Sequence, residues 1–259
     1  MKPLKTFTVG KITAQVFPDK RSLSAAAAAD AAADIAAVQK EKMWANLVFS
    51  TGASQFDFVE SIKEAKGFDW GKVRAFHLDE YVGMSPDHPA SFRRFLRERL
   101  VDFVHPGEVY YLNADAPDVE AECRRYEALL RQYPIDIGFI GIGENGHIAF
   151  NDPPVADFSD PVWVKRVKLD EKCRRQQLGE GWFPTLDAVP REALSQTCTG
   201  LMAYRRVYLI VPERRKAEAV HDALCGPIAT SCPASIMREH PACRLYLDVE
   251  SASLLPQIK

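Results

Sequence analysis

The sequence has neither a surplus of basic residues nor a long run of apolar ones. Its 33 Lys and Arg stand against 35 Asp and Glu, a formal net charge of -2, so the phosphate backbone of a nucleic acid is not an expected partner. No apolar stretch approaches the length of a membrane span, and the first residues lack the apolar core of a signal peptide. We therefore expect a cytoplasmic protein that binds neither nucleic acid nor membrane.

The cysteines also lack the close pairing that a metal site or a disulfide framework would show. They are Cys123, Cys173, Cys198, Cys225, Cys232 and Cys243, and no two form a C-x-x-C pair. Cys225 and Cys232 flank Gly226-Pro227, but no histidine lies at zinc-ligand spacing from them. The sequence therefore predicts reduced thiols, no metal and no cofactor.

What the chain does contain is an alternation of strand and helix patterns. Its 259 residues, 47% of them hydrophobic, suffice for one substantial core, and we expect one α/β domain over 1–259. Strands are expected at 7–17 (as a hairpin arm), 44–49, 73–78, 108–112, 135–140, 164–169, 207–211 and 244–249. Helices are expected at 22–40, which is rich in alanine, and at 56–66, 92–104, 117–133 and 214–224. About 152–187, with prolines at its start, is expected to be an irregular, lid-like segment.

The stretch 135–154 changes abruptly from apolar to polar. An almost continuous β-branched and aromatic run suits a strand buried on both faces of a parallel sheet. Gly141, Gly143 and Gly146 then accompany Asn145 and His147, so polar side chains follow the carboxyl end of a strand, where ligands bind in open α/β sheets. The alternative is a glycine-rich turn in which the histidine is structural, and we favour a functional loop.

The end of the strand expected at 44–49 also carries polar groups. Ser50, Thr51, Gly52 and Ser54 lie between a strand and a helix, where exposed N–H groups and the helix dipole favour an anion, although Ser54 could equally be an ordinary N-cap. Such a phosphate site needs a partner cation.

The strand at 73–78 ends in Asp79-Glu80, and since adjacent strand residues point to opposite faces, only one is expected to enter a site as a base. The alternative for this pair is a solvated acidic turn. Basic residues at 214–216 begin a helix, where they oppose its dipole, so anion binding is a reason for their presence and surface solubility is the other.

Two long motifs join these loops into one pattern, F-H-L-D-E-Y-V-G at 76–83 and G-E-N-G-H-I-A-F-N-D-P at 143–153. Together with the loop 50–54, they resemble the glucosamine-6-phosphate deaminase family, in order and over nearly the whole chain. The resemblance implies a three-layer α/β/α sandwich with a modified Rossmann-like, mostly parallel sheet. It also implies isomerisation of an amino-sugar phosphate from aldose to ketose, coupled to deamination, with glucosamine 6-phosphate as the expected substrate and N-acetylglucosamine catabolism as the setting.

The same resemblance assigns roles to individual residues. Asp79 would move the proton at the sugar's C2, and His147 would open the pyranose ring, supported by Asn145 and Asp152. The phosphate would be held by Thr51, Gly52, Ala53, Ser54, Arg174 and Lys216. We expect Arg174 and Lys216 to converge on the loop 50–54, and Asp79 and His147 to face each other from the ends of neighbouring strands.

Position 152 departs from the family, which has the longer Glu there. We expect the Pro153-Pro154 corner to draw the loop inward so that Asp152 still reaches His147, directly or through water. The alternatives are a 6-phosphogluconolactonase, which Asn145 and the segment 79–83 disfavour, and a sugar-phosphate sensor, for which no helix-turn-helix region precedes the domain. The resemblance leaves the oligomeric state open, a homo-oligomer included.

Overall fold

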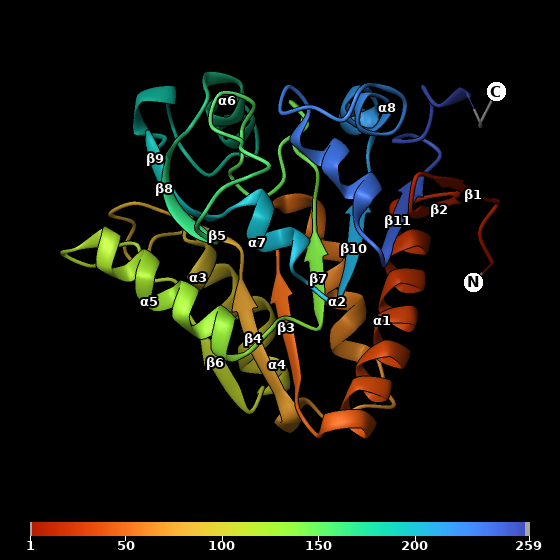
Figure 1. Cartoon of the computed structure of the whole chain (residues 1–259), viewed down its shortest axis with the longest axis horizontal. Coiled ribbons are helices and arrows are strands. Elements are labelled where there is room, and N and C mark those ends of the chain that lie inside the picture. Colours follow the sequence, from red (N-terminus) through yellow and green to blue (C-terminus); the bar gives the residue numbers. More distant parts are fainter. Residues whose placement is uncertain (1, 257–259) are drawn as a thin grey trace.

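The computed structural model describes residues 2–256, and its centre is a mostly parallel sheet (Figure 1). The strand order is β1-β2-β11-β10-β7-β3-β4-β6, and in the described part of the chain the β1–β2 pair alone is antiparallel within this sheet. The strands are β1 (Lys5–Val9), β2 (Ile12–Phe17), β3 (Ala45–Phe49), β4 (Val73–His77), β6 (Glu108–Tyr110), β7 (Ile137–Ile140), β10 (Arg206–Val211) and β11 (Cys243–Asp248).

Helices cover both faces of this sheet. The longer ones are α1 (Lys20–Lys42), α2 (Phe56–Glu64), α5 (Val119–Gln132), α6 (Glu171–Gly179) and α8 (Ala217–Cys225). Shorter helical segments are η1 (Ala53–Gln55), η2 (Trp70–Lys72), α3 (Phe92–Leu96), η3 (Arg97–Val101), α4 (Asp102–Val104), η4 (Leu186–Ala188), α7 (Cys198–Met202), η5 (Arg214–Lys216) and η6 (Pro233–Glu239). In Figure 1 the parallel strands point toward the end of the molecule that carries α6 and α8.

Strand β10 shows how the sequence builds the three layers. Val207, Leu209 and Val211 pack in the cluster that includes α5, α7 and α8, whereas Tyr208 and Ile210 pack in the cluster that includes α1 and α2. Because successive side chains point to opposite faces, a run that is apolar throughout buries both faces of the strand. The three-layer α/β sandwich expected from the sequence is confirmed.

The alanine-rich segment is a helix, as predicted. Asp19 caps α1 by accepting a hydrogen bond from the backbone N–H of Ser22 at 2.7 Å. Small side chains such as Ala27 and Ala31 are fully buried beside Ile35, so α1 lies close against the sheet. Alanine therefore favours helix formation through its high propensity, and its small side chain lets the helix pack closely against the sheet.

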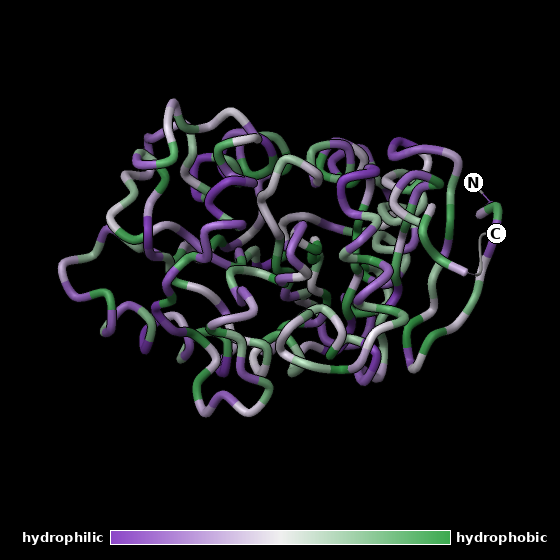
Figure 2. The backbone as a smooth tube through the Cα atoms, turned by 90° about the horizontal axis from the view of Figure 1, so that it is seen from above, coloured by the Kyte–Doolittle hydropathy of each residue, from purple (hydrophilic) through white to green (hydrophobic). Residues whose placement is uncertain are grey.

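A second, smaller sheet lies over the carboxyl ends of the large one. It is antiparallel, in the order β5 (Asp79–Tyr81), β9 (Glu192–Gln196) and β8 (Val164–Lys168). Its own core cluster joins β5 and β8 to α6 through Tyr81, Val167 and Cys173. Figure 2 looks onto this end, where hydrophilic and hydrophobic stretches alternate along the chain.

Most expected elements are present, and three expectations need correction. The lid-like segment 152–187 is not irregular throughout, because it contains the helix α6 in addition to β8, the strand expected at 164–169. Strand β9 was not expected, and Asp79–Tyr81 forms a strand of its own instead of ending β4. In both cases pairing within the small sheet decides the structure, and that pairing joins residues more than 100 positions apart. Across residues 2–256 no helix combines the length and the apolar character needed to cross a bilayer.

Candidate active site

A cleft of about 510 Å³, counting the space open to solvent, lies at the carboxyl ends of the parallel strands. Its walls come from the loops after β3, β4, β7 and β10 and from α6. It is lined by Ser50, Thr51, Gly52, Ser54, Gln55, Leu78, Asp79, Phe92, Gly141, Ile142, Gly143, His147, Ala149, Phe150, Gln176, Gln177, Glu180 and Lys216.

The loop after β3 presents hydroxyl groups to this cleft. Ser50 Oγ and Thr51 Oγ1 are buried and have no hydrogen-bond partner within residues 2–256. Gln55 Nε2 holds the loop by donating to Ser54 Oγ at 3.2 Å and to the carbonyl oxygen of Ile210 at 3.0 Å. Buried hydroxyls without partners are costly unless a ligand satisfies them. Ala53, expected to bind phosphate as well, does not line the cleft.

Lys216 supplies a positive charge on the same cleft. It is only 2% exposed, and no hydrogen bond or ion pair of its ammonium group occurs in the described part of the chain. Burial, reinforced by the neighbouring Arg215 guanidinium, lowers the pKa of Lys216 to about 8. Arg215 itself is paired with Glu213 at 2.7 Å and Glu144 at 3.4 Å. A desolvated ammonium group facing a cleft is suited to an anion.

Arg174 does not converge with Lys216, contrary to expectation. Its guanidinium donates hydrogen bonds to the carbonyl oxygens of Leu186 and Val189, the latter at 3.0 Å from Nη2. It is absent from the residues that line the cleft. The reason is local: α6 directs this side chain to the backbone of 186–189, whose carbonyl groups accept its hydrogen bonds.

Of the adjacent carboxylates, only Asp79 enters the cleft, as the strand alternation predicts. Glu80 is fully buried on the other side, where it accepts hydrogen bonds from Ser91 Oγ at 2.7 Å and from the N–H groups of Tyr81 and Arg93 at 3.0 Å. Burial, together with the nearby charge of Glu80, raises the pKa of Asp79 well above its ordinary value. An acid of this kind is a stronger base once it is ionised.

A buried histidine is hydrogen-bonded to the backbone of Asp79 and holds it in place. His77 Nε2 accepts the N–H of Leu112 at 2.9 Å, so its Nδ1 carries the proton and donates to the carbonyl oxygen of Asp79 at 2.9 Å. Burial lowers the pKa of His77 to about 4, which keeps the ring neutral. His77 is therefore a positioning residue that does not line the cleft.

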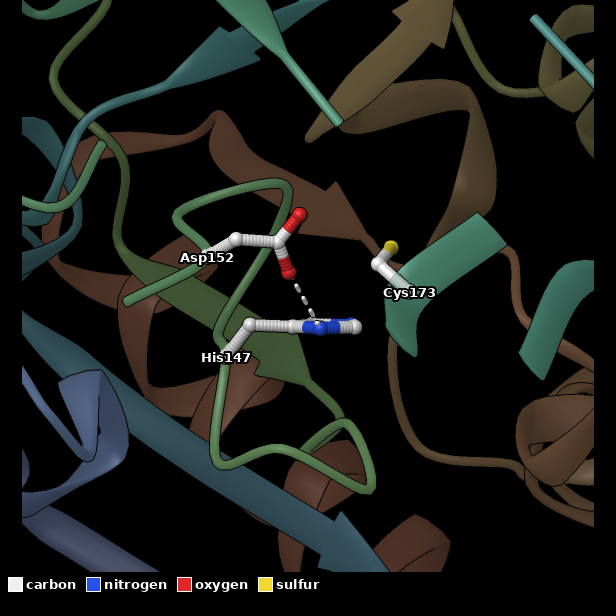
Figure 3. Close-up of side chains that lie close together, drawn as sticks. All are labelled: His147, Asp152 and Cys173. Atoms are coloured by element: carbon white, nitrogen blue, oxygen red, sulfur yellow. Dashed lines mark ion pairs between the residues drawn. The ribbon is translucent and has the colours of Figure 1, made fainter. Parts of the chain in front are cut away.

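His147 meets Asp152 directly. Asp152 Oδ1 lies 2.9 Å from His147 Nδ1, and Figure 3 shows the carboxylate above the face of the ring, outside its plane. Asn145 Nδ2 donates to Asp152 Oδ1 at 2.9 Å, and its own Oδ1 accepts the N–H of His147 at 3.1 Å. The N–H of Asp170 donates to Asp152 Oδ2 at 2.9 Å. Burial is the largest single effect on the pKa of Asp152 and would raise it. The contacts with His147, Asn145 and the N–H of Asp170 together outweigh burial, so the pKa of Asp152 is lowered.

Gly143 makes room for the imidazole. A Cβ atom on Gly143 would lie 2.2–2.4 Å from Cε1, Nε2 and Nδ1 of His147, so the ring packs directly on the glycine backbone. The N–H of Gly143 also donates to the carbonyl oxygen of His147 at 2.8 Å, which closes the loop on itself. Any larger residue at 143 would displace the ring.

Asp79 and His147 line one cleft, but the strands before them are not neighbours. Asp79 follows β4 and His147 follows β7, and β3 with the loop 50–54 lies between these two strands. The intervening strand leaves room for a small molecule between carboxylate and imidazole. The catalytic roles of both residues stay predictions.

The part of the cleft that α6 provides was not predicted from the sequence. Gln176, Gln177 and Glu180 line it, and Gln177 Oε1 accepts the hydroxyl of Tyr81 at 2.7 Å. Their spacing on one helical face was a signal, but a helix at 171–179 had not been expected.

Comparison with known proteins agrees with this geometry. Residues 18–175 match the model of the family glucosamine-6-phosphate isomerases/6-phosphogluconolactonase. The chain belongs to this family. A glucosamine-6-phosphate deaminase of Exiguobacterium sibiricum is 41% identical over 80% of this chain and 79% of its own. One from Geobacillus sp. is 35% identical over 88% and 92% of the two chains.

Solved structures are similar to this chain over most of its length. A structure described as a monomeric glucosamine-6-phosphate deaminase superposes with a TM-score of 0.86 at 32% identity, over 93% of this chain and 99% of its own. The 6-phosphogluconolactonase of Trypanosoma brucei gives 0.74 at 17% identity, over 97% and 100%, which shows the fold alone. The resemblance inferred from the two motifs is confirmed.

Proposed function

We propose that this chain is a glucosamine-6-phosphate deaminase that converts its substrate and water into fructose 6-phosphate and ammonia. The observation that carries the proposal is a buried carboxylate without a hydrogen-bond partner among the described side chains, Asp79, on the same cleft as His147 and Lys216. The similarity to the deaminases of Exiguobacterium sibiricum and Geobacillus sp. supports it. The setting that follows is amino-sugar catabolism in the cytoplasm.

The phosphate end of the substrate lies against Thr51, Gly52, Ser54 and Lys216. The unpartnered hydroxyls and the buried ammonium support this assignment, because together they offer hydrogen bonds and a charge to a dianion. Arg174 is not part of the proposed phosphate site, since its donors are already used by backbone carbonyl groups.

At the other end of the substrate, His147 moves the proton that opens the pyranose ring, and Asp79 takes the proton from C2. That proton is returned at C1 as the aldose becomes a ketose imine, and water then replaces the nitrogen, which leaves as ammonia. Asn145 and Asp152 orient His147 and stabilise its protonated form. The raised pKa of Asp79 supports a base strong enough for a carbon acid.

A second function, lactone hydrolysis, shares the fold. A 6-phosphogluconolactonase needs a base that activates water, and it has no use for a second proton acceptor at the position of a C–H bond. Asp79, in addition to His147, therefore favours the deaminase.

Ammonia release from a panel of amino-sugar phosphates, run beside hydrolysis of 6-phosphogluconolactone, tests the proposal. We expect ammonia and fructose 6-phosphate in equal amounts from glucosamine 6-phosphate. Lactone hydrolysis without ammonia release would overturn it.

A further inference from the structure

Three buried side chains of different chemistry converge beside the cleft. His147 and Asp152 come from the loop after β7, and Cys173 comes from the first turn of α6 (Figure 3). One ligand atom of each, the imidazole nitrogen, a carboxylate oxygen and the thiol sulfur, lies within 4.8 Å of the others. The proposed reaction uses the histidine and the carboxylate but leaves the thiol without a role.

The donor set is suited to a transition metal. Nitrogen, sulfur and one carboxylate oxygen are the ligands of Zn²⁺, whereas Mg²⁺ and Ca²⁺ prefer oxygen alone. Tetrahedral Zn²⁺ needs donor atoms roughly 3.3–3.6 Å apart, from metal–ligand distances of about 2.0–2.3 Å. A pair of donor atoms at the 4.8 Å bound would have to approach by roughly 1.2–1.5 Å, and closer pairs by less.

The nitrogen that would bind the metal has no well-formed hydrogen bond. His147 is 8% exposed, and its Nδ1 is a buried atom without a hydrogen-bond partner in the described residues. Asp152 is near it at 2.9 Å, but it approaches the face of the ring, where no N–H or lone pair points. A buried nitrogen that has no hydrogen-bond partner and lies close to a carboxylate and a thiol is an independent indication of a ligand.

The thiol is inert without a metal. Burial and the neighbouring charge of Asp152 raise the pKa of Cys173 well above its ordinary value, so the sulfur carries a proton. A divalent cation reverses the electrostatic part of this effect, and the proton leaves to solvent as the sulfur binds.

We propose that His147, Asp152 and Cys173 form a site for Zn²⁺ or a similar divalent transition metal, and that the bound metal inhibits the enzyme. His147 lines the cleft, so the fourth position is available to water. Bound through Nδ1, the imidazole can no longer gain a proton there, nor be stabilised by Asp152 as an imidazolium. The inhibitory part rests on the proposed function, whereas metal binding does not.

Co²⁺ replaces Zn²⁺ and makes binding visible without any assay of activity. The chelator-treated enzyme is titrated with CoCl₂ alone, and the near-ultraviolet thiolate-to-metal band is recorded. We expect one Co²⁺ per chain for the wild type and no such band for Cys173→Ala or the nearly isosteric Cys173→Ser. Cys225→Ala, which removes an exposed cysteine, should keep it. Absence of the band in the wild type, or its persistence in both Cys173 variants, would overturn the site.

Inhibition is measured on ammonia release in the presence of ZnCl₂ and reversed with chelator. Cys173→Ser should need about 10- to 100-fold more Zn²⁺ for half inhibition, since loss of one ligand costs at least as much as loss of a residue that orients one. Its metal-free rate should stay near that of the wild type. Equal sensitivity of the two proteins would contradict inhibition through this site, and a cobalt band in a protein that releases no ammonia would refute only the proposed function.

Discussion

The two walls of the cleft differ in how their side chains are held. On the sheet side, each loop begins where a ladder hydrogen bond ends, as at Ser50, whose N–H donates to the carbonyl oxygen of Phe139 at 2.9 Å. On the α6 side, side chains make the attachments: Gln176 Oε1 accepts the N–H of Glu144 at 3.0 Å, and Gln177 accepts the hydroxyl of Tyr81. Strand ends therefore determine the first wall, and pairs of side chains determine the second.

The largest loss should follow from a change on the sheet side at Asp79. Asp79→Asn removes the base but keeps size and polarity, so we expect kcat to fall by about 10³-fold or more. Because the proposed phosphate contacts lie elsewhere on the cleft, calorimetry should show nearly unchanged binding of fructose 6-phosphate. An equal loss of binding would assign Asp79 a structural role.

The second-largest loss of activity should follow from a change at Gly143. Gly143→Ala adds a Cβ within 2.4 Å of three ring atoms of His147, and displacing the imidazole by about 1 Å should lower kcat by about 10²-fold. Gly179→Ala in α6, where an added Cβ meets nothing within 4 Å, is the matched control and should keep full activity. If both variants are equally active, the ring does not act in its observed position.

Asp152 joins the two walls, because its oxygens accept hydrogen bonds from Asn145 on one side and from Asp170 on the other. Asp152→Ala should lower kcat by about 10- to 1000-fold through lost support of His147. Asp152→Glu should also be poorly active, since the carboxylate is fully enclosed. Faster deamination of glucosamine 6-phosphate by Asp152→Glu would indicate an enzyme tuned to another phosphosugar.

Lys216 tests the phosphate contact through pH. Its charge is present below a pKa of about 8 and is lost as pH rises through that value, so kcat/KM should decline above pH 8. Lys216→Arg stays charged and should remove this decline. Lys216→Met should raise KM by about 10- to 100-fold at neutral pH, the effect of one charged hydrogen bond. A wild-type decline unaltered in Lys216→Arg would assign the titration to another group.

Arg174 should give the smallest effect on catalysis. Arg174→Ala should leave KM within about threefold of the wild type and lower Tm by about 2–8 °C, because it removes hydrogen bonds to the carbonyl groups of 186–189. Arg175→Ala, which breaks an exposed pair with Glu171, is the control and should change Tm by less than about 2 °C. A rise in KM as large as that for Lys216→Met would restore Arg174 to the phosphate site.

The contrast between the two walls also explains what the sequence could predict. Thr51, Asp79 and His147 follow buried strands, and parallel strands bring their carboxyl ends together whatever the rest of the chain does. Arg174 carried no such constraint, since its direction depends on the backbone at 186–189. The proposed metal cluster could not be predicted for the same reason: Cys173 is 26 positions from His147 in sequence, too far for a short zinc-ligand motif, and reaches it only because α6 folds over the loop.

The most direct test of the account is a crystal structure of Asp79→Asn with glucosamine 6-phosphate, which this variant should bind without turnover. The account predicts the phosphate within hydrogen-bonding distance of Thr51 Oγ1 and Lys216 Nζ, with C2 beside the residue at 79 and the ring oxygen beside His147. A phosphate held instead by Arg174, or a sugar whose C2 lies away from position 79, would contradict it.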